Sequence, residues 1–138
     1  MPARIITLAA AACFAYMATA SALAQSPAEQ LVAFEREARR SQPPSQVFSA
    51  GRGEQFFRAT HGGDWSCSTC HSDNPARPGK HTRTGKVIEP LAPAANAERF
   101  SDPAKVEKWF KRNCNDVLNR QCTAQEKGDV LTWLMQLK

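Results

Sequence analysis

The sequence predicts an all-α domain in which one long, proline-rich loop joins two groups of helices. Two capping boxes, at residues 26–29 and 123–126, indicate helix starts, because each pairs a hydroxyl residue with Glu three positions later. Apolar residues at helical spacing follow each box, and no segment alternates as a strand does. Residues 72–100 contain prolines at positions 75, 78, 90 and 93, which predicts a loop. A loop of this length is usually functional.

Two helices are expected before the loop. The first spans residues 26–40 and has Leu31, Phe34 and Ala38 on one face. The second spans residues 49–60 and turns Phe56 and Phe57 inward. Glycine and proline residues end both helices, at residues 42–44 and 61–64.

Two further helices are expected after the loop. The third begins at residues 101–103, and its apolar face consists of Val106, Trp109 and Phe110. The fourth begins after Thr123. Its inward residues are Val130, Leu131, Trp133, Leu134 and Leu137.

A short motif stands between the second helix and the loop. Cys67-Ser68-Thr69-Cys70-His71 has the Cys-x-x-Cys-His form of a c-type haem attachment site. Two thiols on one turn reach the two haem vinyl groups, and the adjacent histidine supplies the fifth iron ligand. The motif therefore predicts one covalent haem c held by Cys67, Cys70 and His71.

Two alternative interpretations of the motif are weaker. A thioredoxin-like dithiol requires a βαβ setting, and no strand pattern precedes Cys67. A zinc site requires a second ligand pair, and Cys114 and Cys122 are too widely spaced for the usual one.

Residues 1–24 have the pattern of a secretory signal peptide. Arg4 precedes an apolar run over residues 5–20, and residues 22–24 read Ala-Leu-Ala, a typical cleavage site. The alternative is an uncleaved anchor, but the run is short and rich in alanine. We expect cleavage near Ala24, no membrane span in the mature chain, and a single haem domain over residues 25–138 in the periplasm.

The remaining cysteines and the charge fit an exported redox protein. Cys13 leaves with the leader, so Cys114 and Cys122 remain, and an oxidising compartment favours a disulfide between them over two free thiols. The full chain carries a net charge of +5. This mildly basic balance suits an acidic redox partner and is too weak to indicate nucleic acid binding.

The second axial ligand of the iron is open on residues alone. Met135, three residues from the C-terminus, is the only methionine outside the leader, so a methionine ligand is disfavoured. The candidates are His61, His81, Asn113, Cys114, a lysine, or no residue. Asn113 shares the inward helix face of Val106, Trp109 and Phe110, although it would also suit a helix cap.

Part of the chain resembles the class I cytochromes c. The spacing Gly53-x-x-x-Phe57 matches the first helix of that family, where a small residue lets the C-terminal helix cross closely. Trp133 would be the large residue at the crossing. The resemblance implies a class I cytochrome c-like fold with an extra N-terminal helix and a haem-wrapping loop.

A more specific resemblance covers residues 74–138. The chain is similar to the group formed by the sphaeroides haem protein and cytochrome c-double-prime. The shared segments are Thr82-Arg83-Thr84-Gly85-Lys86, Pro90-Leu91-Ala92-Pro93, Arg99-Phe100-Ser101-Asp102, Val106-Glu107-Lys108-Trp109, and Arg112-Asn113-Cys114-Asn115-Asp116 with Cys122.

This resemblance implies that Asn113 is the distal ligand and that it leaves the iron on reduction. The opened position, beside Trp109 and Phe110, would bind small diatomic ligands such as O2, NO or CO. The resemblance also implies a dihaem cytochrome c and a membrane cytochrome b as electron donors. Arg83 and Lys86 are candidates for pairing with the haem propionates.

Two function classes follow from the sequence. In the first, the protein transfers electrons and its redox-gated site binds diatomic molecules. In the second, it is a plain electron shuttle and the open site is incidental. A third class, thiol–disulfide chemistry at Cys114 and Cys122, lacks the Cys-x-x-Cys spacing that lowers a thiol pKa.

Overall fold

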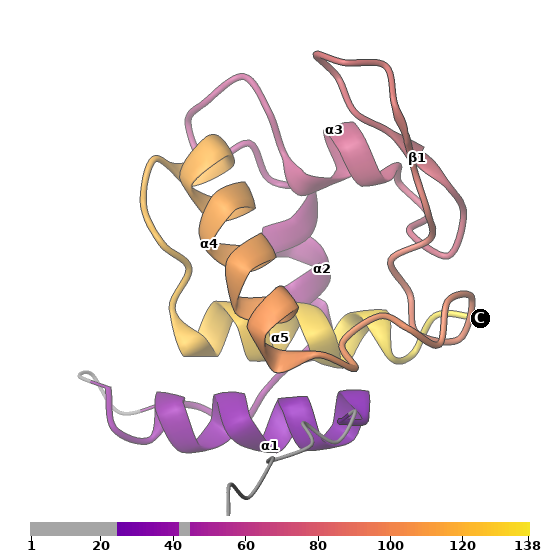
Figure 1. The fold of residues 1–138 in the computed structure, drawn as a ribbon. Helices are drawn as coiled ribbons and strands as arrows, with labels where there is room; N and C mark the ends of the chain where they lie inside the picture. Colours follow the sequence, from indigo (N-terminus) through magenta and orange to yellow (C-terminus); the bar gives the residue numbers. More distant parts are fainter. Residues whose placement is uncertain (1–24, 42–44) are drawn as a thin grey trace, which may run out of the picture.

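The computed structural model describes residues 25–41 and 45–138, so the predicted signal peptide lies outside the described residues. Within the described ranges the chain forms five helices and one short hairpin (Figure 1). The all-α prediction is therefore confirmed. None of the described helices is long and apolar enough to cross a membrane.

The two helices before the motif follow the sequence closely. α1 spans Pro27–Ala38, and the predicted capping box between Ser26 and Glu29 is present. Its face of Phe34 and Ala38 is buried, as expected. α2 spans Ala50–Arg58 and ends two residues before the predicted limit. It stops there because Ala59 is extended and His61 has a left-handed backbone with φ of 54°.

The haem motif forms a short helix, and the loop after it contains a small sheet. α3 spans Cys67–His71. Ser66 is its N-cap and forms a capping box in which Thr69 stands where Glu or Gln is usual. β1 (Gly79–Lys80) and β2 (Val87–Ile88) pair antiparallel. The prediction of a strand-free loop was wrong at this point. A turn at residues 81–86, with Gly85 at φ of 68°, brings the two segments together.

The two helices after the loop also begin where predicted. α4 spans Pro103–Leu118 behind the N-cap Asp102, and α5 spans Ala124–Leu134 behind Thr123. α4 ends at Asn119, which has a left-handed backbone. Four of the five predicted inward residues of α5 are buried, and Leu137 packs against the core just beyond the helix end.

α2 and α5 cross closely at Gly53, as the class I resemblance implied. A Cβ atom at Gly53 would collide with the backbone carbonyl of Asp129. Beside the crossing, the Phe57 and Trp133 rings lie 5.0 Å apart between centroids. The absent side chain of Gly53 therefore sets the distance between the two helices.

A buried carboxylate fastens the same crossing. The Asp129 side chain, on α5, accepts hydrogen bonds from the Ser49 backbone N–H at 2.7 Å and from Arg52 Nε and Nη2 at 2.8 Å each. Gln125 Nε2 donates to it at 3.1 Å. A buried charge that is paired and fully hydrogen-bonded is tolerated, and here it fixes the start of α2 on α5.

The additional N-terminal helix packs along the opposite side of α5 (Figure 1). The Phe34 ring of α1 meets Phe110 of α4 edge to face, with centroids 5.7 Å apart. The buried Lys127 of α5 donates to Glu107 of α4 at 2.8 Å and lies 3.6 Å from Glu37 of α1. This ammonium group joins three helices.

We predict that Gly53→Ala prevents the native crossing. The added methyl group meets a backbone carbonyl that cannot rotate away, so we expect a loss of several kcal/mol and little accumulated protein. Gly51→Ala is the matched control in the same helix, because a Cβ there meets only Ser49 Oγ at 3.8 Å. The control should raise stability by about 0.5–1 kcal/mol. Thermal unfolding of the two variants checks this, and equal midpoints would contradict it.

Candidate functional site

The two thiols and the imidazole of the motif lie together on α3. Cys67 and Cys70 are free thiols, and Cys67 packs against the hydrophobic core. The His71 ring is half-buried, with its centroid 6.2 Å from that of Phe57 on α2. The capped turn thus presents all three predicted haem residues from one short helix.

Burial sets the protonation of this group. Burial, together with the positive charge of Arg99, lowers the pKa of His71 to about 4, so the imidazole is neutral at physiological pH. A neutral imidazole is the form that binds iron. Burial also raises the pKa of the Cys67 thiol to about 11. Thiolate chemistry requires the opposite shift, which weighs against the redox-dithiol interpretation.

The loop after the motif lies directly against α3. A Cβ atom at Gly79 would collide with the carbonyl oxygen of Cys70, so only glycine permits this approach. The Thr82 hydroxyl is 3.0 Å from the Cys70 sulfur. The Arg83 guanidinium lies 5.5 Å from the centre of the Trp65 ring, just before the motif. The loop therefore contacts the chain both before α3, at Trp65, and within α3, at Cys70.

Arg83 and Lys86 both lie in the exposed part of the hairpin. Arg83 contacts Trp65, and the Lys86 carbonyl accepts a hydrogen bond from His81 N–H at 2.8 Å. Neither side chain pairs with a carboxylate of the described residues. Their pairing with haem propionates stays a prediction.

α4 presents two adjacent strips of side chains rather than one. Val106, Phe110 and Cys114, at spacing i, i+4 and i+8, face the core. Trp109 and Asn113 form the neighbouring strip. The expectation that Trp109 points into the core was wrong: it is 45% exposed and lies between Lys108 and Arg112. The core face is centred on Phe110, which leaves Trp109 on its flank.

Asn113 lies in the interior of α4 and is half-buried. The alternative that it caps the helix was wrong, because α4 continues to Leu118 and Asn119 is the cap. Its amide makes no hydrogen bond to the described part of the chain. A half-buried amide without a protein partner is available as a ligand.

The other candidate ligands are engaged locally. His61 Nε2 lies 2.9 Å from the carbonyl oxygen of Phe56, and its ring packs on the Phe56 ring. His81 Nδ1 accepts from the Thr84 N–H at 3.3 Å within the hairpin turn. Cys114 is joined to Cys122, with Cα atoms 5.6 Å apart, which removes it as a thiolate ligand.

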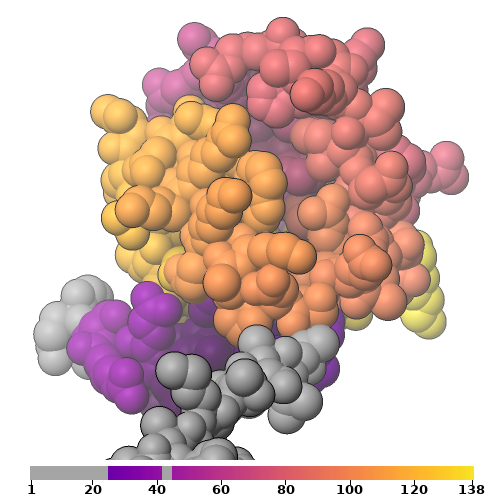
Figure 2. Space-filling model, in the orientation of Figure 1, coloured from indigo at the N-terminus to yellow at the C-terminus, as the bar shows by residue number. Residues whose placement is uncertain are grey.

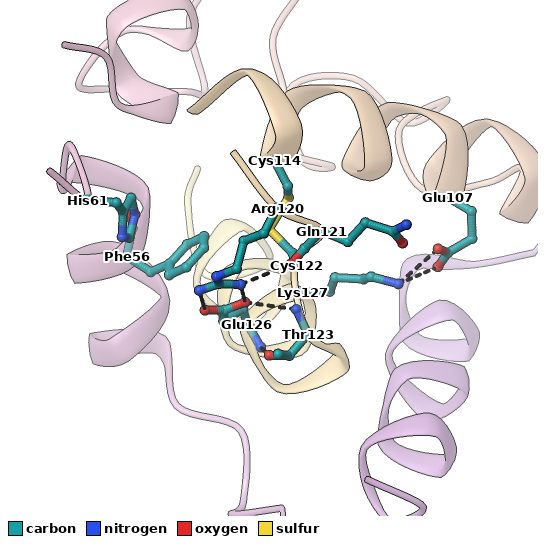
Figure 3. The surroundings of a disulfide bond; sticks show 10 residues. All are labelled: Phe56, His61, Glu107, Cys114, Arg120, Gln121, Cys122, Thr123, Glu126 and Lys127. Carbon is teal, nitrogen blue, oxygen red and sulfur yellow. Dashed lines mark hydrogen bonds and ion pairs between the residues drawn. A yellow bond between two sulfur atoms is a disulfide. The ribbon is translucent and has the colours of Figure 1, made fainter. Parts of the chain in front are cut away.

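The turn beside Asn113 is held at several points (Figure 3). The Cys114–Cys122 disulfide is buried and links α4 to the segment before α5. Arg120 pairs with Glu126 through two hydrogen bonds of 2.6 and 2.9 Å. The Glu126 carboxylate also accepts from the Thr123 N–H as part of the predicted capping box. The backbone next to Asn113 is therefore rigidly placed.

These residues fit a c-type haem. The motif supplies two free thiols and a neutral imidazole, and α4 supplies the Asn113 amide, which has no hydrogen-bond partner among the described residues. Between α4 (orange) and the hairpin loop (salmon), Figure 2 shows a hollow with darker magenta atoms at its floor. Phe57, Leu91 and Phe110 supply apolar surface in the core cluster nearby.

Three residues near the motif were not identified as functional from the sequence. They are Trp65, Thr82 and Arg99, of which Thr82 and Arg99 stand in family segments. Arg99 Nε and Nη2 donate to the carbonyl oxygens of Pro90 and Glu89. Trp65 stands two residues before Cys67 in the sequence, whereas only the fold brings Thr82 and Arg99 to the motif.

Comparison with known proteins identifies the family. Residues 43–134 match the family described as a domain of unknown function, DUF1924. The cytochrome c-type protein SHP of Cereibacter sphaeroides is 45% identical over 113 residues, which cover 79% of this chain and 82% of that protein. Cytochrome c'' of Methylophilus methylotrophus is 38% identical over 130 residues, 90% of each chain.

Two solved structures share the fold. The crystal structure of oxidised cytochrome c'' matches with a TM-score of 0.71 at 34% identity, over 81% of this chain and 94% of that one. Oxidised SHP, described as an oxygen-binding cytochrome c, matches with a TM-score of 0.68 at 45% identity, over 80% and 96% of the two chains.

We predict that peptide mapping without reduction finds Cys114 joined to Cys122. Replacing both residues by alanine should lower the free energy of unfolding by about 2.5 kcal/mol, because the bridge closes a short loop in the unfolded chain. Urea unfolding of the two proteins measures this difference. Recovery of both cysteines in alkylated form from untreated protein would contradict the pairing.

Proposed function

The chain belongs to the family of c-type cytochromes that includes SHP and cytochrome c'', and on this premise we propose that it is an exported monohaem electron carrier with a redox-gated binding site. The family membership and the shared fold support a monohaem cytochrome directly. The gate, the export and the partners are the additional parts of the proposal.

The proximal side is formed by α3. Cys67 and Cys70 would hold the haem covalently, and His71 would supply its neutral imidazole to the iron. Haem bound in this way supplies an iron atom that accepts one electron reversibly and binds O2, NO or CO at any coordination position left open. Gly79 and Thr82 keep the loop close against α3.

The single observation that supports the gate is the environment of the Asn113 side chain. Its amide is half-buried in the middle of α4 and has no hydrogen-bond partner in the described chain. The adjacent disulfide fixes its backbone. A residue held in this way loses little further entropy when it binds the iron.

Asn113 should hold the oxidised iron and release the reduced one. An amide oxygen is a hard, neutral and weak donor, so it favours the more highly charged ferric state. Histidine would bind both states more evenly, and methionine would favour the ferrous state. A solution structure of cytochrome c'' is described as giving insight into haem-ligand detachment in that protein. We propose that Asn113 detaches in the same sense here and leaves the position for O2, NO or CO.

The second candidate is a plain electron shuttle. It uses the same proximal residues, and the exposed basic side chains of the loop, such as Arg83 and Lys86, would face an acidic partner. We propose a dihaem cytochrome c and a membrane cytochrome b as the electron donors in either case. The two candidates differ in whether reduced protein takes up a small molecule.

Covalent attachment is tested first. Denatured protein should keep its haem colour, because thioethers to Cys67 and Cys70 survive unfolding. Acid–acetone extraction that removed the haem would contradict c-type attachment. Cys67→Ala or Cys70→Ala should reduce accumulation, since the haem completes a small core.

The gate is tested by replacing its ligand. Reduced wild type should be five-coordinate and bind CO rapidly, while oxidised wild type should be six-coordinate. Asn113→Ala should bind azide or cyanide in the oxidised state about tenfold faster or more, because an internal competitor worth about 1.4 kcal/mol is removed. Asn113→His should slow CO binding. Visible spectra and stopped-flow kinetics measure both effects.

The matched control is Asn115→Ala, an exposed asparagine on the same helix. It should leave both spectra and the anion-binding rates unchanged. If reduced wild type stays six-coordinate and does not bind CO, the gate is wrong and the shuttle takes its place. His61 and His81 are then the next ligands to test.

A further inference from the structure

Gln25 is the first residue after the expected signal-peptide cleavage site. Residues 22–24 read Ala-Leu-Ala, and cleavage after Ala24 would give Gln25 a free α-amino group. An N-terminal glutamine carries a nucleophile and an electrophile in one residue, because a bond from its α-nitrogen to its own Cδ closes a five-membered ring. The α-nitrogen of every later glutamine belongs to a peptide bond, so this chemistry is confined to Gln25.

Gln25 lies where two helices begin. Its backbone N–H donates to the carbonyl oxygen of Ser101 at 2.8 Å. The next residue, Ser26, is the N-cap of α1, and Asp102, which follows Ser101, is the N-cap of α4. The start of the mature chain is therefore joined by a hydrogen bond to the backbone that leads into α4.

A charged α-ammonium group is poorly suited to this position. The N-terminus of each helix carries a partial positive charge. The carboxylates nearby already serve the two helix ends. Glu29 accepts from the Ser26 N–H at 2.7 Å. Asp102 accepts from the Lys105 N–H at 3.1 Å. An uncharged nitrogen with a single N–H fits better, since it can still donate to the carbonyl group that accepts from it here.

The side chain of Gln25 is not fixed in its open form. Its Oε1 atom is buried and has no hydrogen-bond partner among the described residues. A buried polar atom without a partner is unfavourable. The contacts of this oxygen therefore do not oppose rotation of the side-chain amide toward the α-nitrogen of the same residue.

We propose that Gln25 of the mature protein is converted to pyroglutamate. An α-amino group is partly uncharged at neutral pH, and in that form its nitrogen attacks Cδ. The bond between Cδ and Nε2 breaks, and Nε2 leaves as ammonia with one proton from the α-nitrogen. No oxidant or further reactant is consumed. The product is neutral and keeps one N–H for Ser101. The inference rests on the export proposed above, with cleavage after Ala24.

The modification should stabilise the N-terminal helix. Cyclisation removes a positive charge two residues before Pro27, where α1 begins, and replaces a freely rotating terminal residue by a rigid ring. Because α1 packs along α5, its stability adds to that of the whole domain. We expect the ratio of folded to unfolded protein to be about threefold larger than with an open N-terminus.

Mass spectrometry of the exported, haem-loaded protein tests the modification. The N-terminal peptide should begin at residue 25 and be lighter by one ammonia than the peptide with an open glutamine, once the intact mass is constant. It should also resist Edman degradation until the protein is treated with a pyroglutamate-specific aminopeptidase.

Gln25→Asn is the matched control. It keeps a side-chain amide but is one methylene shorter, so the same attack would require a strained four-membered ring. Its N-terminal peptide should begin at residue 25 and carry a free α-amino group that reacts in the first Edman cycle.

The stabilising effect has its own readout. In denaturant unfolding at low salt, the folded-to-unfolded ratio of Gln25→Asn should be about threefold below that of wild type. The difference should shrink at about 1 M salt, where the Debye length falls to about 3 Å. A difference caused only by the shorter side chain would not respond to salt.

Several outcomes would overturn the inference. An open glutamine at residue 25 would refute the modification, and so would a mature chain that begins at another residue. Equal unfolding of wild type and Gln25→Asn would refute the stabilising effect. None of these results bears on haem attachment or CO binding, which visible spectra of the same samples report. A purified chain that retains residues 1–24 would count against the proposed export and, with it, this inference.

Discussion

The close crossing of α2 and α5 is the contact on which the rest of the structure depends. Gly53 lets the two backbones meet, and the Asp129 carboxylate then binds the start of α2 through Ser49 and Arg52. α3 follows α2 after a short segment, so the crossing places the haem motif. α5 also carries the turn that holds the end of α4 through the disulfide. The α2–α5 pair therefore positions both sides of the proposed haem site.

α4 carries two adjacent strips of side chains, one packed in the core and one facing away from it. The strip of Val106, Phe110 and Cys114 anchors the helix in the core, where Phe110 packs on Phe34 of α1. The strip of Trp109 and Asn113 is left free of the core. Asn113, which we propose as a weak ligand, is carried by a helix that other residues anchor. The N-terminal helix contributes by closing the core behind α4 and by supplying Glu37 to Lys127.

The long loop is held by specific polar contacts, by its glycines, and by buried apolar residues such as Pro75, Ala92 and Phe100. Gly79 allows it to touch α3, Gly85 turns the hairpin, and Arg99 satisfies two of its carbonyl groups. Each contact ties the loop to the motif or to itself. The loop can therefore act as a rigid wall for a cofactor although its regular structure is limited to β1 and β2.

The sequence by itself determined the helices, where they start, and the motif from which the proximal side is predicted. Capping boxes, helical spacing and the Cys-x-x-Cys-His motif are local signals, so α1, α5 and α3 were predictable from a few neighbouring residues. The tertiary structure decided which strip of α4 faces the core. It showed that Trp109 lies outside the core and that Asn119, not Asn113, caps the helix. It also brought Thr82 and Arg99 to the motif. These are contacts between residues far apart in the chain, and helical spacing does not encode which of two adjacent strips a neighbouring helix will cover.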